Sequence, residues 1–121
     1  MANNITNTVL QAAHGFSLQQ LVYINGTMTY ALSQADTAAH CETVGIVTSV
    51  PDVNHFSVTT NGYCTGFAGL VAGTVYWVSD ATAGLLTITQ PTTSGHISKP
   101  VFVADSTTSG YFTDYRGYVI P

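Results

Sequence analysis

Charged side chains are scarce in this sequence. Asp, Glu, Lys and Arg make up 7% of the 121 residues, against about 25% in typical soluble proteins. The only cations are Lys99 and Arg116, and six acids bring the net charge to −4. Without a basic patch, the chain has no means of neutralising nucleic-acid phosphates or of anchoring to anionic lipid. We therefore expect no nucleic-acid partner and no membrane partner.

Long apolar runs are also absent, so no segment is long enough to span a bilayer as a helix. The first residues, "MANNITNTVL", have neither a basic region nor an apolar core. The sequence therefore predicts no signal peptide. The Met start and the end at Pro121 favour a whole, small gene product.

Cysteine is represented only by Cys41 and Cys64. Small secreted domains usually carry a denser disulfide pattern, so we expect two reduced, buried thiols, with a single disulfide as the alternative. Together with His40 and His55 these cysteines are acceptable zinc ligands. Their spacing contains no C-x-x-C or H-x-x-x-H pattern, and we predict no metal site and no cofactor.

Hydroxyl and apolar side chains take the place of charge. The chain has nineteen Thr and nine Ser, and 45% of its residues are hydrophobic. That apolar content excludes disorder. A neutral surface lacks the charge repulsion that keeps monomers apart, so we expect much of it to contact other protein.

Strand signals recur every 8 to 12 residues, the spacing of an all-β protein. Asn25-Gly26 and Asn61-Gly62 each predict a tight turn, since Asn-Gly pairs accept positive φ angles. Strands are expected over residues 21–24, 27–32, 44–50, 55–60, 63–67, 74–79, 85–89, 99–106 and 115–120. The predicted fold is all-β: a compact β-barrel or β-sandwich of about eight short antiparallel strands with an extended N-terminal arm.

Domain organisation follows from the two ends of the pattern. Residues 1–12, rich in Asn and Thr, read as the N-terminal arm, and residues 13–121 as a single β domain. Residues 31–42 contain helix-forming side chains but no apolar stripe, which allows at most one short helical turn.

No constellation of catalytic residues stands out. Asp105 and Ser106 lie near a "TTSG" segment, but no G-x-S-x-G elbow accompanies them. The acids sit mostly at predicted turns, as Asp commonly does; they are Asp36, Glu42, Asp52, Asp80, Asp105 and Asp114. The N-x-T sequons at Asn4 and Asn25 carry no expectation of glycosylation. We therefore predict a protein that is not an enzyme and has no catalytic, cofactor-binding or metal-binding residue.

Aromatic residues crowd the second half of the chain. They include Tyr63, Tyr76, Trp77, Phe102, Tyr111, Phe112, Tyr115 and Tyr118. Because successive strand residues face opposite sides, the hairpin over residues 74–89 splits into two apolar sets. Tyr76, Val78, Leu86 and Ile88 form one set, and Val75, Trp77, Leu85, Thr87 and Thr89 the other. One set should fill the core, and the other, with the "GYFTDY" segment, should meet a subunit, or else stack on sugar.

Four segments resemble small β-domains of tailed-bacteriophage structural proteins, found in head decoration proteins and tail-fibre modules. They are "AHGFSLQQLVYINGTMTYAL", "VGIVTSV", "GFAGLVAGTVYWVSDATAGLLTITQP" and "SGHISKPVFVADSTTSGYFTDYRG". The chain departs from the pattern at Gln19-Gln20-Leu21, where such domains carry Gly-Asp before the strand. The resemblance implies a virion role and supplies no active-site residues.

The length and the absence of stalk repeats favour a protein that coats a pre-built lattice. We expect a capsid decoration, or cement, protein that binds the outer capsid surface as a homotrimer and stabilises the shell. Its partners would be itself and the major capsid protein, and its location the virion, assembled in the host bacterial cytoplasm. The alternative is a receptor- or sugar-binding module of a tail fibre or tailspike.

Overall fold

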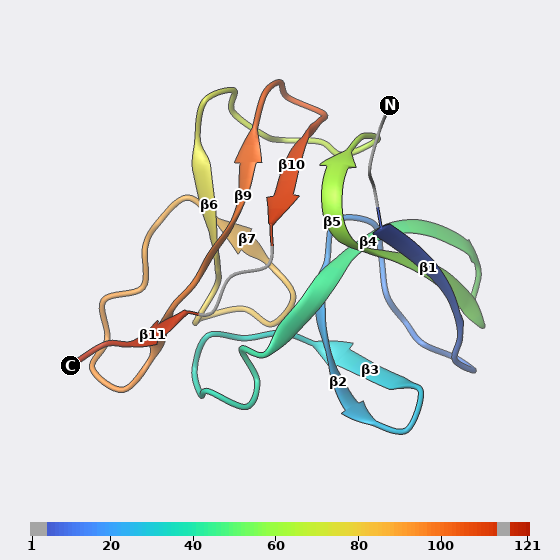
Figure 1. The fold of residues 1–121 in the computed structure, drawn as a ribbon, viewed down its shortest axis with the longest axis horizontal. Helices are drawn as coiled ribbons and strands as arrows, with labels where there is room; N and C mark the ends of the chain where they lie inside the picture. Colours follow the sequence, from blue (N-terminus) through green and yellow to red (C-terminus); the bar gives the residue numbers. More distant parts are fainter. Residues whose placement is uncertain (1–4, 114–116) are drawn as a thin grey trace.

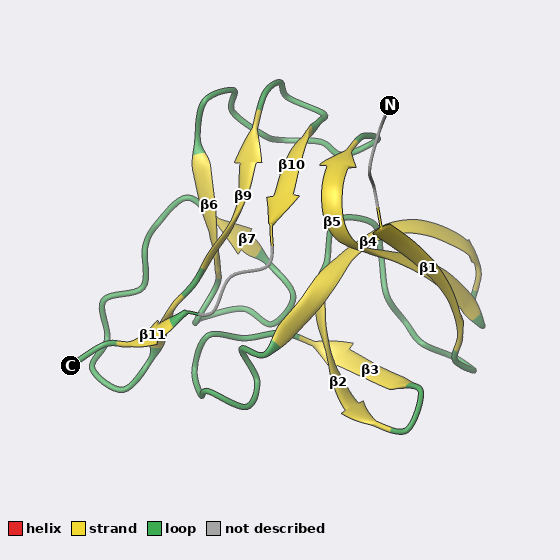
Figure 2. Cartoon of the chain, viewed as in Figure 1, coloured by secondary structure: helices red, strands yellow, loops and turns green. Residues whose placement is uncertain are grey.

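The computed structural model describes residues 5–113 and 117–121 of the chain, and the described residues contain strands and no helix (Figure 2). The all-β fold predicted from the sequence is confirmed. Most strands belong to one antiparallel sheet that curls on itself like a half-barrel (Figure 1). In the described part of the chain, no helix is long and apolar enough to cross a membrane.

Eleven strands are described. They are β1 (Ile5–Leu10), β2 (Leu21–Gly26), β3 (Thr29–Leu32), β4 (Thr43–Asp52), β5 (His55–Cys64), β6 (Val75–Val78), β7 (Leu86–Thr87), β8 (Ile97–Ser98), β9 (Pro100–Ala104), β10 (Gly110–Thr113) and β11 (Tyr118–Val119). The order in the large sheet is β3-β2-β4-β5-β10-β9-β6-β7, with β1 paired to β5 beside this path. β8 and β11 form a second, two-stranded sheet.

The strand β5 joins the two halves of the molecule. Its residues from His55 to Asn61 pair with β1, and those from Asn61 to Cys64 pair with β10. The turn predicted at Asn61-Gly62 is wrong, because the strand continues through this pair. Gly62 has a φ of 133°, which only glycine adopts readily, and it lies where β5 changes partners.

The turn predicted at Asn25-Gly26 is also displaced. β2 extends to Gly26, and the chain reverses over Thr27 and Met28. Met28 takes the left-handed conformation, with a φ of 53°. The register of β2 and β3 shifts between Ile24 and Gly26. Asn25-Gly26 therefore lies at an irregularity in the strand pairing and does not form a two-residue turn.

The described part of the expected N-terminal arm is a strand of the chain's own sheet. β1 pairs with β5 along its whole length, and Val9 is buried. After β1, the Gln11 side chain reaches the outer edge of β3: its Nε2 donates to the Tyr30 carbonyl (3.1 Å), and its Oε1 accepts from the Tyr30 amide (2.8 Å). One carboxamide thus replaces a neighbouring strand at this edge.

The buried residues form two core clusters, and the larger one includes residues from both halves, such as Leu21 on β2 and Phe102 on β9. The first cluster contains Val9, Phe16, Val22, Val47, Phe56 and Val58. The second contains Leu21, Ala35, Cys41, Ile46, Cys64, Phe67, Leu70, Tyr76, Val78, Leu86, Ile97, Val101, Phe102, Ala104 and Phe112.

The His-Gly-Phe segment has a structural role in the first half. The Phe16 amide donates to Nδ1 of His14 (2.9 Å), so the ring proton sits on Nε2. This Nε2 donates to the carbonyls of Asp52 and His55, both at 2.9 Å, and so fastens the β4–β5 turn. The segment of residues 31–42 continues from the end of β3 into turns. The Cys41 amide donates to the Thr37 carbonyl (3.1 Å) and closes one short helical turn, the most that the sequence allows.

Candidate interaction surface

The most prominent feature on the outside of the second half is an apolar sheet face. Cross-strand partners form a row over four strands: Val75 on β6 is opposite Val103 on β9, Val103 opposite Tyr111 on β10, and Tyr111 opposite Tyr63 on β5. Opposite residues in antiparallel strands share a face. We call this row, with Trp77 and Thr113, the outer face.

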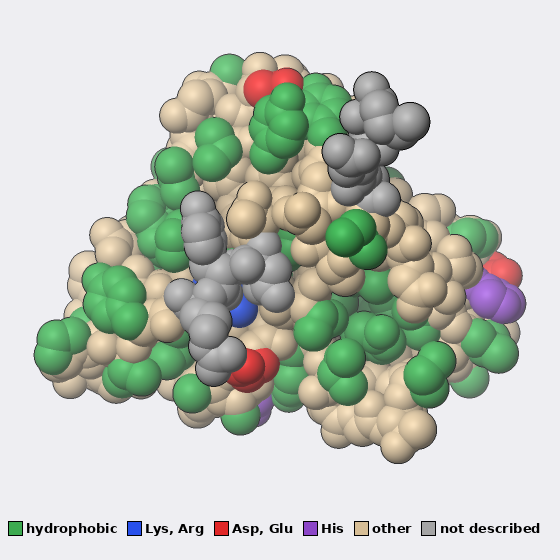
Figure 3. Space-filling view, viewed as in Figure 1, with side chains coloured by type: hydrophobic (Ala, Val, Ile, Leu, Met, Phe, Trp, Pro, Cys, Tyr) green, Lys and Arg blue, Asp and Glu red, His purple; other side chains and the backbone are tan. Residues whose placement is uncertain are grey.

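Exposure of the outer face is substantial. The exposed fractions of the side chains are 56% for Tyr111, 44% for Val103 and 38% for Val75. Trp77 is half-buried. Figure 3 shows apolar side chains gathered over β6, β9 and β10, with acidic atoms visible beyond the upper ends of β9 and β10.

A shallow groove of about 340 Å³ runs along this face. It is lined by Val75, Trp77, Pro100, Val101, Phe102, Val103, Tyr111 and Thr113. None of these side chains is charged, and the only hydroxyl groups among them are those of Tyr111 and Thr113. The groove therefore favours an apolar occupant over an ionic one.

The two sets predicted for the 74–89 hairpin are largely as observed. Tyr76, Val78 and Leu86 are buried, and Val75 and Leu85 are exposed. Ile88 is the exception, since it lies beyond the end of β7 and is 59% exposed. The hairpin pairing itself is short, with Trp77 opposite Thr87 and Val78 opposite Leu86.

The sequence predicts the hairpin and the "GYFTDY" segment, which contains Tyr111 and Thr113, on an interaction surface, but does not indicate Val103. Val103 follows the buried pair Val101-Phe102, so period-2 alternation is broken before it. A bulge between Tyr76 and Trp77 in the β6–β9 register accompanies this break. Tyr115 lies outside the described residues.

Asp105 and Ser106 belong to a polar network at the rim of the outer face. The Tyr63 hydroxyl donates to Oδ2 of Asp105 (2.8 Å), and Ser109 Oγ donates to Oδ1 (2.6 Å). Ser106 Oγ lies 2.6 Å from Ser109 Oγ. Hydrogen bonds from Ser109 and Tyr63 hold the pKa of the Asp105 carboxyl below its usual value, so the rim carries a negative charge at neutral pH.

The histidines are engaged away from this network. His40 pairs with Asp36, His55 with Asp52 and His96 with Asp80, each at 2.9 Å, while His14 bonds to backbone. Burial raises the pKa of the Asp36 carboxyl, but the hydrogen bond and charge of His40, together with hydrogen bonds from the backbone amides of Asp36 and Thr37, outweigh this and lower the pKa overall. The hydrogen bond from His55, with backbone amides, lowers the pKa of Asp52.

The four candidate zinc ligands do not converge on one site. His40 lies in a turn and His55 begins β5, while the two cysteines are buried in the second core. Within residues 5–113 and 117–121, no group of three or more His, Cys, Asp or Glu side chains is arranged to hold a metal ion. Asn4, Asp114 and Arg116 lie outside the described residues.

Cys41 and Cys64 are not joined by a disulfide in the described structure. Burial raises the pKa of the Cys64 thiol to about 11. Thiolate rather than thiol is the reactive form, and three pH units below this pKa about one thiol in a thousand is ionised.

We expect the folded protein to resist alkylation by iodoacetamide at pH 8, and its melting temperature to be unchanged by a reducing agent. Mass spectrometry of alkylated samples and a thermal melt measure the two effects. Protein unfolded in urea is the control, in which both thiols should react. A native disulfide contributes about 2–5 kcal/mol, so a large fall in melting temperature on reduction would contradict the assignment.

Comparison with known families finds no matching family model, and comparisons with curated proteins and with solved structures find no match.

Proposed function

We propose that the protein is a non-enzymatic structural protein of a phage virion, a capsid decoration protein that binds the outer capsid surface as a homotrimer and stabilises the shell. The outer face is the observation that carries this proposal. It presents exposed apolar side chains on an antiparallel sheet and no charged side chain along its groove. The resemblance of four sequence segments to phage structural β-domains supports the choice of particle.

Burial against another protein surface is energetically favourable for the outer face. Burying apolar surface yields about 25 cal/mol per Å², and aromatic side chains bury about 150–250 Å² each. Lys99 is only 4% exposed, and its Nζ donates to the Cys41 carbonyl (3.1 Å), so this cation does not protect the surface. Association through the outer face removes Tyr111 and Val103 from water without separating an ion pair.

Attachment to a shell then follows from repetition. A capsid presents many identical sites, so several weak contacts made by one trimer reinforce one another through their high effective concentration. Clamping neighbouring shell subunits requires interfaces of more than about 1,000 Å². The outer face supplies part of this area, and the other exposed apolar side chains, such as Leu10 and Val53, lie elsewhere on the surface.

A receptor-binding or sugar-binding module of a tail fibre is the second candidate. The rings of Tyr63 and Tyr111 lie 4.9 Å apart, next to the Asp105 carboxylate and the Ser106 and Ser109 hydroxyls. Exposed aromatic rings beside hydrogen-bonding groups suit a sugar. Copy number separates the candidates: hundreds of copies per particle mean decoration, and tens or fewer mean a tail component.

A matched pair of valine substitutions tests the role of the outer face. We expect wild-type protein to sediment as a trimer at micromolar concentration, and Val103→Lys to sediment as a folded monomer because a charge enters the interface. Val53→Lys changes a 70% exposed valine on the β4–β5 turn and should leave the trimer intact. A wild-type monomer with no affinity for its own capsid would contradict the proposal.

A further inference from the structure

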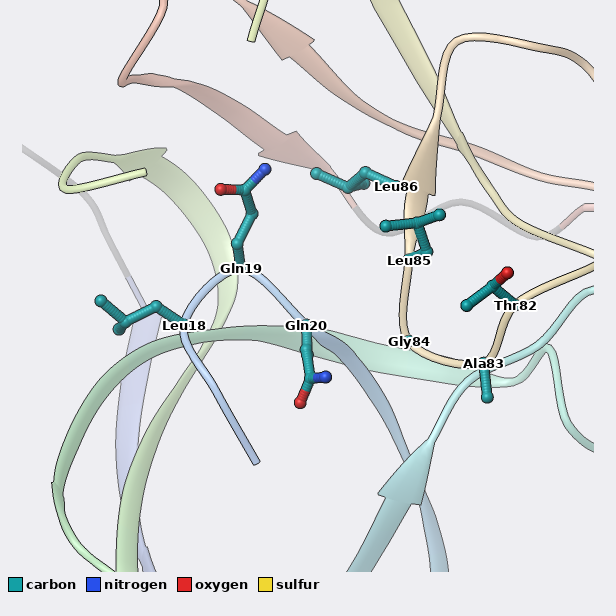
Figure 4. A pocket seen from close by; sticks show the side chains of 8 residues that line it. All are labelled: Leu18, Gln19, Gln20, Thr82, Ala83, Gly84, Leu85 and Leu86. Carbon is teal, nitrogen blue, oxygen red and sulfur yellow. The ribbon is translucent and has the colours of Figure 1, made fainter. Parts of the chain in front are cut away.

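A second hollow lies between two loops, one from each half of the fold. The loop of residues 17–20 precedes β2, and the loop of residues 82–85 precedes β7 (Figure 4). The Leu21 amide donates to the Gly84 carbonyl (3.0 Å) and ties the two loops together. The space enclosed is about 240 Å³, and Leu18, Gln19, Gln20, Thr82 and Leu85 are among its lining residues.

Gln19 holds an unusual conformation at this place. Its φ is 76°, in the left-handed region that glycine occupies without strain and that residues with a side chain seldom adopt. The backbone is fixed by a bond from the Gln19 amide to the Val47 carbonyl (2.8 Å). Strained residues of this kind concentrate at functional sites, so a binding role for the Gln19 side chain is worth testing.

The carboxamides of Gln19 and Gln20 are both oriented by backbone donors. Oε1 of Gln19 accepts from the Ala68 amide (3.1 Å), and Oε1 of Gln20 accepts from the Ser17 amide (2.8 Å). A backbone N–H can only donate, so the carbonyl end of each carboxamide must face it. The NH₂ group of each side chain is therefore directed away from these bonds.

The five glutamines of the chain divide sharply in this respect. Nε2 of Gln11 donates to Tyr30, that of Gln34 to Asp80 and that of Gln90 to Ser98. Nε2 of Gln19 and Gln20 has no acceptor among the described residues. In Figure 4 the two side chains leave the loop in opposite directions, with both amide nitrogens on the side of the facing loop.

The chemistry of the lining selects the ligand. Two separated NH₂ groups, open to solvent, can donate to an acceptor, and Leu18 and Leu85, 45% and 50% exposed, offer aliphatic contacts. The eight lining residues include no aromatic ring for a sugar and no cation for an anion. Peptide carbonyl groups are uncharged acceptors that come with aliphatic side chains attached.

We propose that this hollow binds an extended peptide segment of a partner protein. Backbone carbonyls of the segment accept from Nε2 of Gln19 and Gln20, and one aliphatic side chain packs against Leu18 and Leu85. The site is separate from the outer face, and its occupancy does not depend on the trimer.

The test uses N-acetyl-leucine methylamide, which has two carbonyls and one isobutyl group. We expect millimolar concentrations to shift the side-chain NH₂ signals of Gln19 and Gln20 in ¹⁵N–¹H spectra of the full-length protein. The NH₂ signals of Gln11, Gln34 and Gln90 are internal controls and should stay in place, because these groups already donate within the protein and do not line the hollow.

Glutamate substitutions distinguish the loss of an NH₂ donor from a disturbance of the fold. Gln19→Glu and Gln20→Glu keep an acceptor for the Ala68 and Ser17 amides but remove the NH₂ group, and each should weaken probe binding at least tenfold. Gln90→Glu adds the same charge elsewhere and should leave binding unchanged. Absence of probe-induced shifts, or shifts caused instead by acetate or methyl galactoside, would overturn the proposal.

Discussion

Replacement of Phe56 by alanine is expected to lower the free energy of unfolding by about 3–5 kcal/mol. Phe56 is fully buried in the first core. Its ring meets those of Phe16 at 5.0 Å and Tyr30 at 5.4 Å, both edge-on, and that of His14 at 5.2 Å. Alanine would leave a cavity and break three aromatic contacts, each worth about 0.5–1.5 kcal/mol beyond burial.

Urea denaturation followed by fluorescence measures this change. Leu10→Ala is the control, because Leu10 lies on β1 with 67% of its side chain exposed, and the effect there should be within about 0.5 kcal/mol. If Phe56→Ala cost no more than Leu10→Ala, Phe56 could not hold the first half together.

Substitution of Gly45 by alanine should be as severe, for the opposite reason. Gly45 lies in β4 opposite Val22, and a Cβ atom there would lie 2.5 Å from Cγ2 of Val58 and 2.6 Å from the Thr59 carbonyl oxygen. A backbone oxygen cannot rotate away as a side chain can, so the sheet must shift. We expect a loss of about 3 kcal/mol in the free energy of unfolding.

The matched control is Gly26→Ala. A Cβ at Gly26 would lie 3.6 Å from Cβ of Thr29, an ordinary contact. This variant should keep its stability to within about 1 kcal/mol in the same denaturation experiment. Equal stability of the two alanine variants would mean that β4 and β5 are not as close as described.

The sequence predicts best those parts of the fold in which apolar and polar residues alternate along a strand. The sequence places Tyr76 and Val78 together on one side of their strand because large apolar residues alternate there, and the structure shows that this is the buried side. Alternation depends only on the geometry of an extended chain. Ile88 fits the same pattern but lies outside the core, because β7 ends at Thr87 and no partner strand holds Ile88 inward.

Turns predicted from Asn-Gly dipeptides are less reliable, because the dipeptide indicates only a local conformational preference that long-range strand pairing can override. At Asn61-Gly62, pairing with β1 on one side of the pair and with β10 on the other keeps the chain extended. At the β2–β3 connection, Met28 rather than glycine supplies the positive φ. Neither result follows from the dipeptides alone.

The two candidate sites also differ in how far the sequence predicts them. Outward-facing apolar residues of the hairpin indicated an interaction surface, but the joining of β6, β9, β10 and β5 into one face needs the strand order. The hollow at Gln19 left a fainter signal. In the sequence it is marked only by two adjacent glutamines, Gln19-Gln20, before the predicted strand, and Gln19 is where the backbone takes a left-handed conformation.

The sharing of β5 by the two halves has a consequence for folding. Thr6 meets Thr59 across 53 positions of sequence, and Tyr63 meets Ser109 across 46, so the pairings made by this strand are remote in the chain. Topologies dominated by such remote contacts fold in milliseconds to seconds rather than microseconds. Because melting either half would strip one end of β5, both halves should unfold in one cooperative transition.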